Sequence, residues 1–157
     1  MRLSNTANPS DPLLVAYLGL AFTGVSNVAA VAAAVSESQL LPPSGAVMAA
    51  SPIGVWVSLA TAGDILVTSF ATPLATSDGL GQSVYLGSPA GVSTIRHGTN
   101  ATPQGTLIKR MSLPAAVGTQ VLWPYELAVP HGQGLVIAAV TVNVAMIVSW
   151  NFVEVWG

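Results

Sequence analysis

The stretch GLVIAAVTVNVAMIVSWNFVEVWG, Gly134–Gly157, decides the fold. It carries no charge before Glu154, so most of its side chains must be buried away from water. Its second half alternates with a period of two. Polar Ser149 and Asn151 fall on one side of that alternation, which is the pattern of a β-strand with one buried face. The predicted buried face holds Met146, Val148, Trp150 and Phe152.

The first half of the stretch, Leu135–Val142, is apolar on both sides and rich in Val and Ile, as in a strand covered on both faces. Asn143 offers a turn, so Gly134–Trp156 is predicted to form a β-hairpin or a closely spaced strand pair. A membrane span is the alternative. The uninterrupted apolar run is only about 14 residues where about 20 are needed, so we expect no membrane partner.

The same alternation recurs along the chain. Ile53–Leu59 is followed by a Gly-containing turn and by Ile65–Phe70, which predicts a second hairpin. Gly and Pro turns separate the further predicted strands, which are Leu13–Phe22, Gln82–Leu86, Val92–Arg96, Thr106–Leu113 and Gln120–Trp123. About eight short strands of this kind are typical of an all-β fold, an antiparallel β-sandwich or jelly roll.

Two segments depart from this pattern. Asn27–Glu37 is rich in alanine and follows Ser26, a possible helix N-cap, so a short helix and a strand both remain open. Residues 1–12 are polar and contain two prolines, which predicts an extended N-terminal arm that orders on contact, with a frayed terminus as the alternative. Residues 13–157 are then a single β-sandwich domain.

The composition limits the partners. Charged residues make up 6% of the chain, where an ordinary soluble domain has about 25%. So few ions leave a free monomer prone to association, so we expect a homo-oligomer. Four basic residues and a net charge of −2 cannot neutralise a phosphate backbone, so nucleic acid is excluded as a partner. The absence of cysteine removes disulfides and thiolate chemistry.

Catalytic and metal-binding patterns are missing from the sequence. His97 and His131 stand far apart, and neither has a His, Asp or Glu at the local spacing of a metal site. No set of titratable residues suggests a reaction, so we expect a non-enzymatic protein without cofactor or metal. Trp56 and Trp123 allow an alternative, because sugars stack on exposed aromatic faces, whereas Trp150 belongs to the predicted core.

The pair Lys109–Arg110 lies within a predicted strand, so the two side chains point to opposite faces. One of them then faces the other layer or a neighbouring subunit, where a salt bridge to Glu126 or Glu154 could form. A solvated strand edge is the simpler interpretation.

The last third of the chain, WPYELAVPHGQGLVIAAVTVNVAMIVSWNFVEVWG, resembles the ending of small tailed-phage virion proteins. These end with a Pro-containing segment, a G-x-G-L turn into an apolar strand, and a final strand that carries a Trp and a Glu. The matching positions are Pro130, Gly132, Gly134, Leu135, Trp150 and Glu154. The resemblance lies in the general character of roughly the last 35 residues and not in a strict motif. It implies a jelly roll that assembles as a trimer, commonly as a capsid decoration or cement protein.

The expected function is therefore that of a virion structural protein on the capsid surface, which stabilises the shell through contacts with its own copies and with the major capsid protein or another virion protein. The alternative is a receptor- or glycan-binding module of a phage tail or fibre. The residues expected to take part in assembly are Arg2, Leu3, Asn8, Pro9, Lys109, Arg110, Trp123 and Trp156.

Overall fold

The computed structural model describes residues 20–45, 48–85, 87–124 and 126–156. The described residues form strands and no helix, which confirms the predicted all-β class. The strands are β1 (Ala21–Val28), β2 (Val35–Leu41), β3 (Met48–Leu59), β4 (Gly63–Ser69), β5 (Thr76–Leu80), β6 (Gln82–Ser83), β7 (Thr94–Asn100), β8 (Thr106–Leu113), β9 (Thr119–Leu122), β10 (Leu135–Ala139) and β11 (Met146–Trp156).

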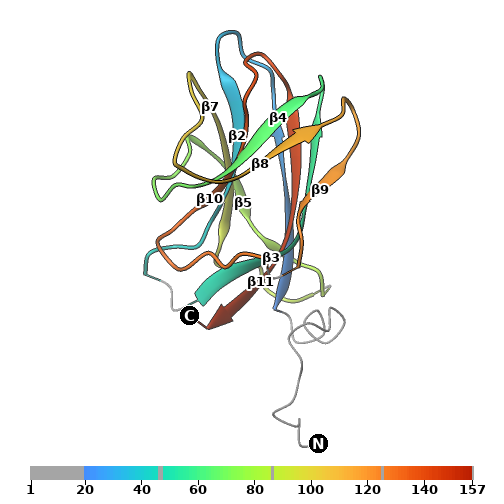
Figure 1. Ribbon diagram of the computed structural model, residues 1–157. Helices are drawn as coiled ribbons and strands as arrows, with labels where there is room; N and C mark the ends of the chain where they lie inside the picture. The colour runs from blue at the N-terminus through green and yellow to red at the C-terminus, as the bar shows by residue number, and fades with distance from the viewer. Residues whose placement is uncertain (1–19, 46–47, 86, 125, 157) are drawn as a thin grey trace, which may run out of the picture.

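Two antiparallel sheets lie face to face and form a β-sandwich (Figure 1). The first sheet has the strand order β6-β1-β11-β3-β9, and the second has the order β5-β7-β2-β10-β4-β8. We call them sheet A and sheet B. Consecutive strands lie in different sheets except at two steps. Strands β4 and β5 both belong to sheet B, and so do β7 and β8.

The strand pairing is that of a jelly roll. The first half of the chain pairs with the second half from the ends inward, as β1 with β11, β2 with β10, β3 with β9 and β4 with β8. These eight strands are those of a jelly roll, a long hairpin wrapped into two four-stranded sheets. The remaining strands β5, β6 and β7 are inserted between β4 and β8, and they extend both sheets at the edge formed by β1 and β2.

The core lies between the two sheets and is built by the alternation seen in the sequence. The side chains of Met146, Val148, Trp150 and Phe152 are fully buried, as predicted, and face the buried residues of sheet B. Fully buried Val55, Val57 and Leu59 of β3 continue the same layer. At Asn151–Phe152 a β-bulge shifts the register with β3. The predicted alternation therefore holds as far as Phe152, while Val153 and Glu154 are both buried beyond it.

Both predicted hairpins are wrong as pairings. β10 and β11 lie in different sheets, and so do β3 and β4, so that each pair faces across the core instead of sharing hydrogen bonds. Asn143 does lie in the turn between β10 and β11, with a positive φ of 58° that Asn tolerates. The sequence pattern does not distinguish these arrangements. Two consecutive strands that each have one buried face can pair in one sheet, or they can lie in opposite sheets with their buried faces toward each other.

The segment Asn27–Glu37, left open between helix and strand, contains the end of β1, a turn and the start of β2. Its alanines lie in and around the turn, where Ala33 has a positive φ of 58°. Strand β2 is buried from Val35 to Leu40 although four consecutive residues of it are polar. The loops that cover this polar strand form the cleft described in the next section.

Candidate functional site

The residues predicted for assembly are only partly placed. Arg2, Leu3, Asn8 and Pro9, with the predicted arm 1–12, lie outside the described residues, and so does the side chain of Trp156. Lys109, Arg110 and Trp123 are described, and all three lie toward the edge of the sandwich that β8 and β9 form. The structure thus brings one part of the predicted set together.

Lys109 points from β8 toward sheet A, where its Nζ donates to the carbonyl of Val121 in β9 at 3.2 Å. The same ammonium forms a salt bridge with Glu126 at 2.8 Å, which is one of the two pairings considered from the sequence. Glu126 also accepts a hydrogen bond from the backbone N–H of Trp123 at 3.1 Å. The hydrogen bond from Lys109, followed by that from Trp123, lowers the pKa of Glu126. The Glu126 carboxylate therefore links Lys109 of β8 to the backbone of Trp123, a residue that is 58% exposed.

Arg110 points to the opposite face of β8 and donates to Asp64 of β4 through Nε at 2.8 Å. Hydrogen bonds from Ser112 and from Arg110 lower the pKa of Asp64. Because the pair is solvent-exposed, its contribution to stability is small. The solvated-edge interpretation thus fits Arg110, while Lys109 connects the two layers.

His97 has a partner that the sequence did not reveal. Its Nδ1 lies 2.8 Å from Oδ1 of Asp78, and the other oxygen of Asp78 accepts a hydrogen bond from Ser26 at 2.7 Å. In a hydrolytic triad the imidazole contacts the serine and removes its proton. Here the carboxylate lies between them, so the imidazole of His97 does not contact the hydroxyl of Ser26. The cluster joins β1, β5 and β7 at the edge of the two sheets.

The outward face of sheet A carries no charged side chain along the described parts of β1, β11, β3 and β9. Its large apolar members are Val25, Trp56 and Ile147, which are 55%, 45% and 45% exposed. Val25, Ser149 and Trp56 lie side by side in one cross-strand row, so a small residue separates two large ones. The outward residues are Thr23, Val25, Asn27, Gly54, Trp56, Ser58, Gln120, Ile147, Ser149 and Asn151. We call this surface the uncharged face.

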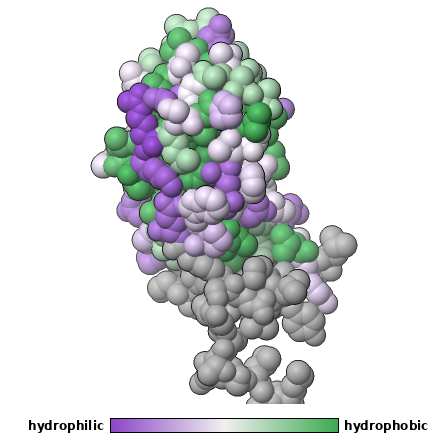
Figure 2. Space-filling view, turned by 45° about the vertical axis from the view of Figure 1, so that its right-hand side comes forward, coloured by the Kyte–Doolittle hydropathy of each residue, from purple (hydrophilic) through white to green (hydrophobic). Residues whose placement is uncertain are grey.

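Exposed hydrophobic residues elsewhere include two pairs that are adjacent in sequence, Val84–Tyr85 and Leu107–Ile108. In the view of Figure 2, hydrophobic and hydrophilic residues are interspersed over the surface. Small groups of exposed apolar side chains are normal on soluble proteins and need no partner. The uncharged face is distinguished by its lack of ions over four adjacent strands.

The outer face of sheet B is covered by two loops that buried polar side chains hold in place. Gln39 of β2 donates to the carbonyls of Phe70 and Thr72 at 2.7 and 3.1 Å, and accepts from the N–H of Leu74 at 2.9 Å. The side chains of Gln39 and of its neighbour in the strand, Glu37, are fully buried. The loop between β4 and β5 is therefore fastened to the sheet at three points.

Glu37 holds the second loop, between β7 and β8. Its carboxylate accepts hydrogen bonds from the side-chain amide of Asn100 and from the backbone N–H of Gln104, the latter at 2.7 Å. Burial raises the pKa of Glu37, and the two hydrogen bonds lower it by a smaller amount. Thr68 of β4 adds a hydrogen bond to the carbonyl of Gln104 at 2.7 Å.

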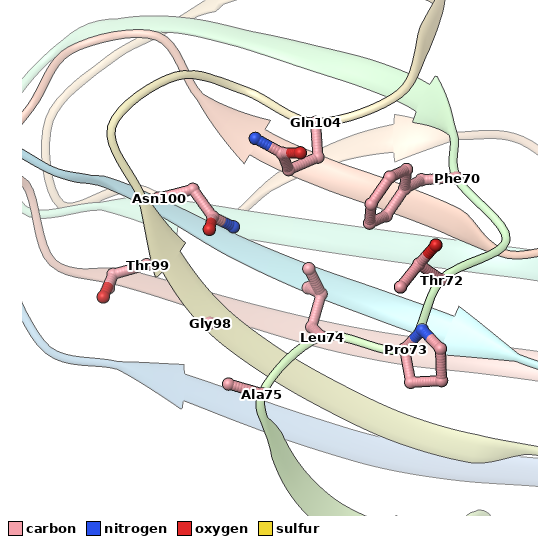
Figure 3. A pocket seen from close by; sticks show the side chains of 9 residues that line it. All are labelled: Phe70, Thr72, Pro73, Leu74, Ala75, Gly98, Thr99, Asn100 and Gln104. Atoms are coloured by element: carbon pink, nitrogen blue, oxygen red, sulfur yellow. The ribbon is translucent and has the colours of Figure 1, made fainter.

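A cleft of about 290 Å³ opens between these two loops (Figure 3). Figure 3 shows the Phe70 ring and the amides of Asn100 and Gln104 around the opening, with Leu74 at its floor. The cleft is lined by Phe70, Thr72, Pro73, Leu74, Ala75, Gly98, Thr99, Asn100 and Gln104. None of these residues was predicted as a site, because the sequence gives no sign that residues 70–75 and 98–104 meet.

Comparison of the chain with protein-family models, with curated proteins and with solved structures gives no significant match. Among the residues that the structure describes, no three His, Cys, Asp or Glu side chains gather as metal ligands would. The described part also contains no helix with the length and hydrophobicity to cross a membrane.

Proposed function

We propose that the protein is a non-enzymatic structural subunit of a virion, of the capsid-decoration type, which associates with its own copies through the uncharged face. One observation carries the proposal: four adjacent strands present an outward surface without ions in a jelly-roll sandwich. A surface that lacks charges has little to hold a charged partner, and it fits best against a second surface of the same kind. A second copy of this chain supplies such a surface.

The shape of the uncharged face also suits a copy of itself. Large Val25, Trp56 and Ile147 alternate with small Ser149 and Ser58, so that projecting side chains have neighbouring depressions. Completing the burial of each half-exposed apolar side chain contributes about 1 kcal/mol, about half the value for full burial. Three such residues contribute about 3 kcal/mol per copy, so the other outward residues of the face must add to an oligomer that is stable in solution.

Replacing Ile147 by lysine should dissociate the oligomer, because a charge within the uncharged face would lose its hydration on association. Light scattering coupled to size-exclusion chromatography measures the result. The full chain should have the mass of an oligomer, and Ile147→Lys should have the mass of a monomer.

Val31→Lys is the matched control, because Val31 is 44% exposed but lies in the turn between β1 and β2. It should leave the mass unchanged. A monomeric full chain at high concentration, or equal behaviour of the two variants, would contradict the proposed use of this face.

Removal of residues 1–12 separates attachment from self-association. A chain that begins at residue 13 should keep its strand-rich circular dichroism and its oligomeric mass, since the strands described here begin at Ala21. It should co-sediment less with capsid shells of the same virus if the arm lies over a neighbouring subunit. Undiminished co-sedimentation would remove the arm from the proposal.

A receptor- or glycan-binding module of a phage tail is the second candidate, and the exposure of Trp56 and Trp123 favours it. Trp123 is 58% exposed, and its backbone N–H donates to Glu126, which also pairs with Lys109. A glycan array with Trp56→Ala and Trp123→Ala distinguishes the two functions. Specific binding that disappears in these variants would favour the module.

A further inference from the structure

We propose that the cleft between the loop of residues 70–75 and the end of β7 binds a single neutral saccharide unit. The site is distinct from the uncharged face, because it lies on the outer side of sheet B. It is also distinct from the exposed tryptophans. The proposal therefore goes beyond the assembly role and stands or falls separately from it.

The polar groups of the cleft match the hydroxyl groups of a sugar. The hydroxyl of Thr72 and the side-chain carbonyl of Gln104 make no hydrogen bond within the part of the chain that the structure describes. Asn100 uses its amide N–H to contact Glu37, which leaves its Oδ1 free to accept. Together these groups offer one hydroxyl, which both donates and accepts, and two carbonyl acceptors.

An apolar surface lies next to these polar groups. Phe70 is partly exposed and its ring borders the opening, with Leu74 below (Figure 3). The C–H face of a pyranose is apolar, whereas its rim is made of hydroxyls. A pocket with an aromatic wall and a few converging polar groups is what small-molecule sites usually present.

The walls of the cleft are held in place before any ligand arrives. Gln39, Glu37 and Thr68 are buried side chains of sheet B, and they fix both loops through six hydrogen bonds. Arg96 supports the loop from the sheet, since its Nε donates to the carbonyl of Leu74 at 2.7 Å. A site that is ordered in advance loses less conformational entropy on binding.

Size and charge select the class of ligand. About 290 Å³ is near the lower limit of ligand pockets, a volume that suits one sugar ring. No charged side chain lines the cleft. The guanidinium of Arg96 is engaged with the loop carbonyls, and the Glu37 carboxylate lies behind Asn100 and Gln104. An anionic ligand would find no free cation there, so a neutral sugar is favoured.

The test is a titration of the ¹⁵N-labelled full chain, followed by NMR, with D-glucose, D-galactose, D-mannose and N-acetyl-D-glucosamine. At least one neutral sugar should give saturable shifts of the backbone signals of Thr99, Asn100 and Gln104. A dissociation constant in the millimolar range is expected for one sugar ring. N-acetylneuraminic acid, which is anionic, should cause no saturable shift at these signals.

Two variants locate the binding. Gln104→Ala removes the side-chain carbonyl but keeps the backbone N–H that contacts Glu37, and it should weaken binding about three- to tenfold. Phe70→Ala should weaken it by at least as much. Trp56→Ala and Trp123→Ala are the controls and should bind as the full chain does.

Three results would overturn the proposal. They are the absence of saturable shifts with all four neutral sugars, equal binding of the anionic sugar, and binding that is lost in the tryptophan variants but kept in Gln104→Ala. If Phe70→Ala fails to fold, Gln104→Ala alone decides. None of these results changes the oligomeric mass, so the assembly proposal is tested independently.

Discussion

Replacement of Trp150 by alanine should lower the free energy of unfolding by about 3–5 kcal/mol, the range for large aromatic residues in a core. Trp150 is the largest fully buried side chain among the residues that the structure describes. Its ring lies between the sheets, and its indole N–H donates to Ser38 Oγ of β2 at 2.8 Å. The variant would leave a cavity and would also remove this link between sheet A and sheet B. The loss would be from about one fifth to all of the total stability of about 5–15 kcal/mol that is typical of a domain.

Urea denaturation at one fixed protein concentration measures the effect, because association contributes to the apparent stability of an oligomer. Trp150→Phe keeps most of the volume and should cost clearly less. Trp56→Ala removes the same kind of side chain from the uncharged face, where it is 45% exposed, and should also cost less. A loss at Trp150→Ala no greater than at Trp56→Ala would show that the indole does not fill the core.

The strands were predictable where one face is apolar and the other polar. Strand β8 has the predicted bounds, Thr106–Leu113, and the inward residues of β11 are those that the alternation indicates. Hydrophobic periodicity reports burial, and burial is what a sandwich imposes on alternate residues. The fold class therefore followed from the sequence.

The pairing of strands could not be predicted from the sequence. Residues 60–62 and 140–145 connect strands of different sheets, although each connection is short enough for a hairpin. The deciding contacts are distant in sequence, as in the pairing of Ala21 with Val153 and of Gly63 with Leu113. A local pattern carries no information about such partners.

The cleft was not predictable for a related reason. Strand β2 has the sequence VSESQLL, in which apolar and polar residues do not alternate, yet it is central in its part of sheet B. Glu37 and Gln39 are buried because loops from residues 70–75 and 100–105 cover them. Buried polar side chains require hydrogen-bond partners, and here those partners are supplied by segments more than 30 positions away.

Replacement of Glu37 by alanine should lower the free energy of unfolding by about 2 kcal/mol, because the partly buried N–H of Gln104 would lose its acceptor. The loop of residues 100–105 would also lose one of its attachments, so the Gln104 amide should exchange its hydrogen faster. Glu37→Gln is the matched control. Its oxygen can accept from Gln104 and its NH₂ can donate to the Asn100 amide after that group turns over, so we expect both hydrogen bonds to be kept.

The comparison of wild type with Glu37→Gln has a defined pH dependence. Burial raises the pKa of Glu37 above the ordinary 4.5, so between pH 4.5 and the raised value the folded chain binds more protons than the unfolded chain. The stability of the wild type relative to Glu37→Gln must then fall as the pH rises through this window, and become constant above it. Asp64 and Glu126, whose pKa values are lowered, act in the opposite direction at acid pH, but they are common to both proteins and cancel in the difference. Urea denaturation of the two proteins from pH 4 to pH 8 measures this difference, and a constant value over the whole range would mean that Glu37 does not carry its charge in a buried place.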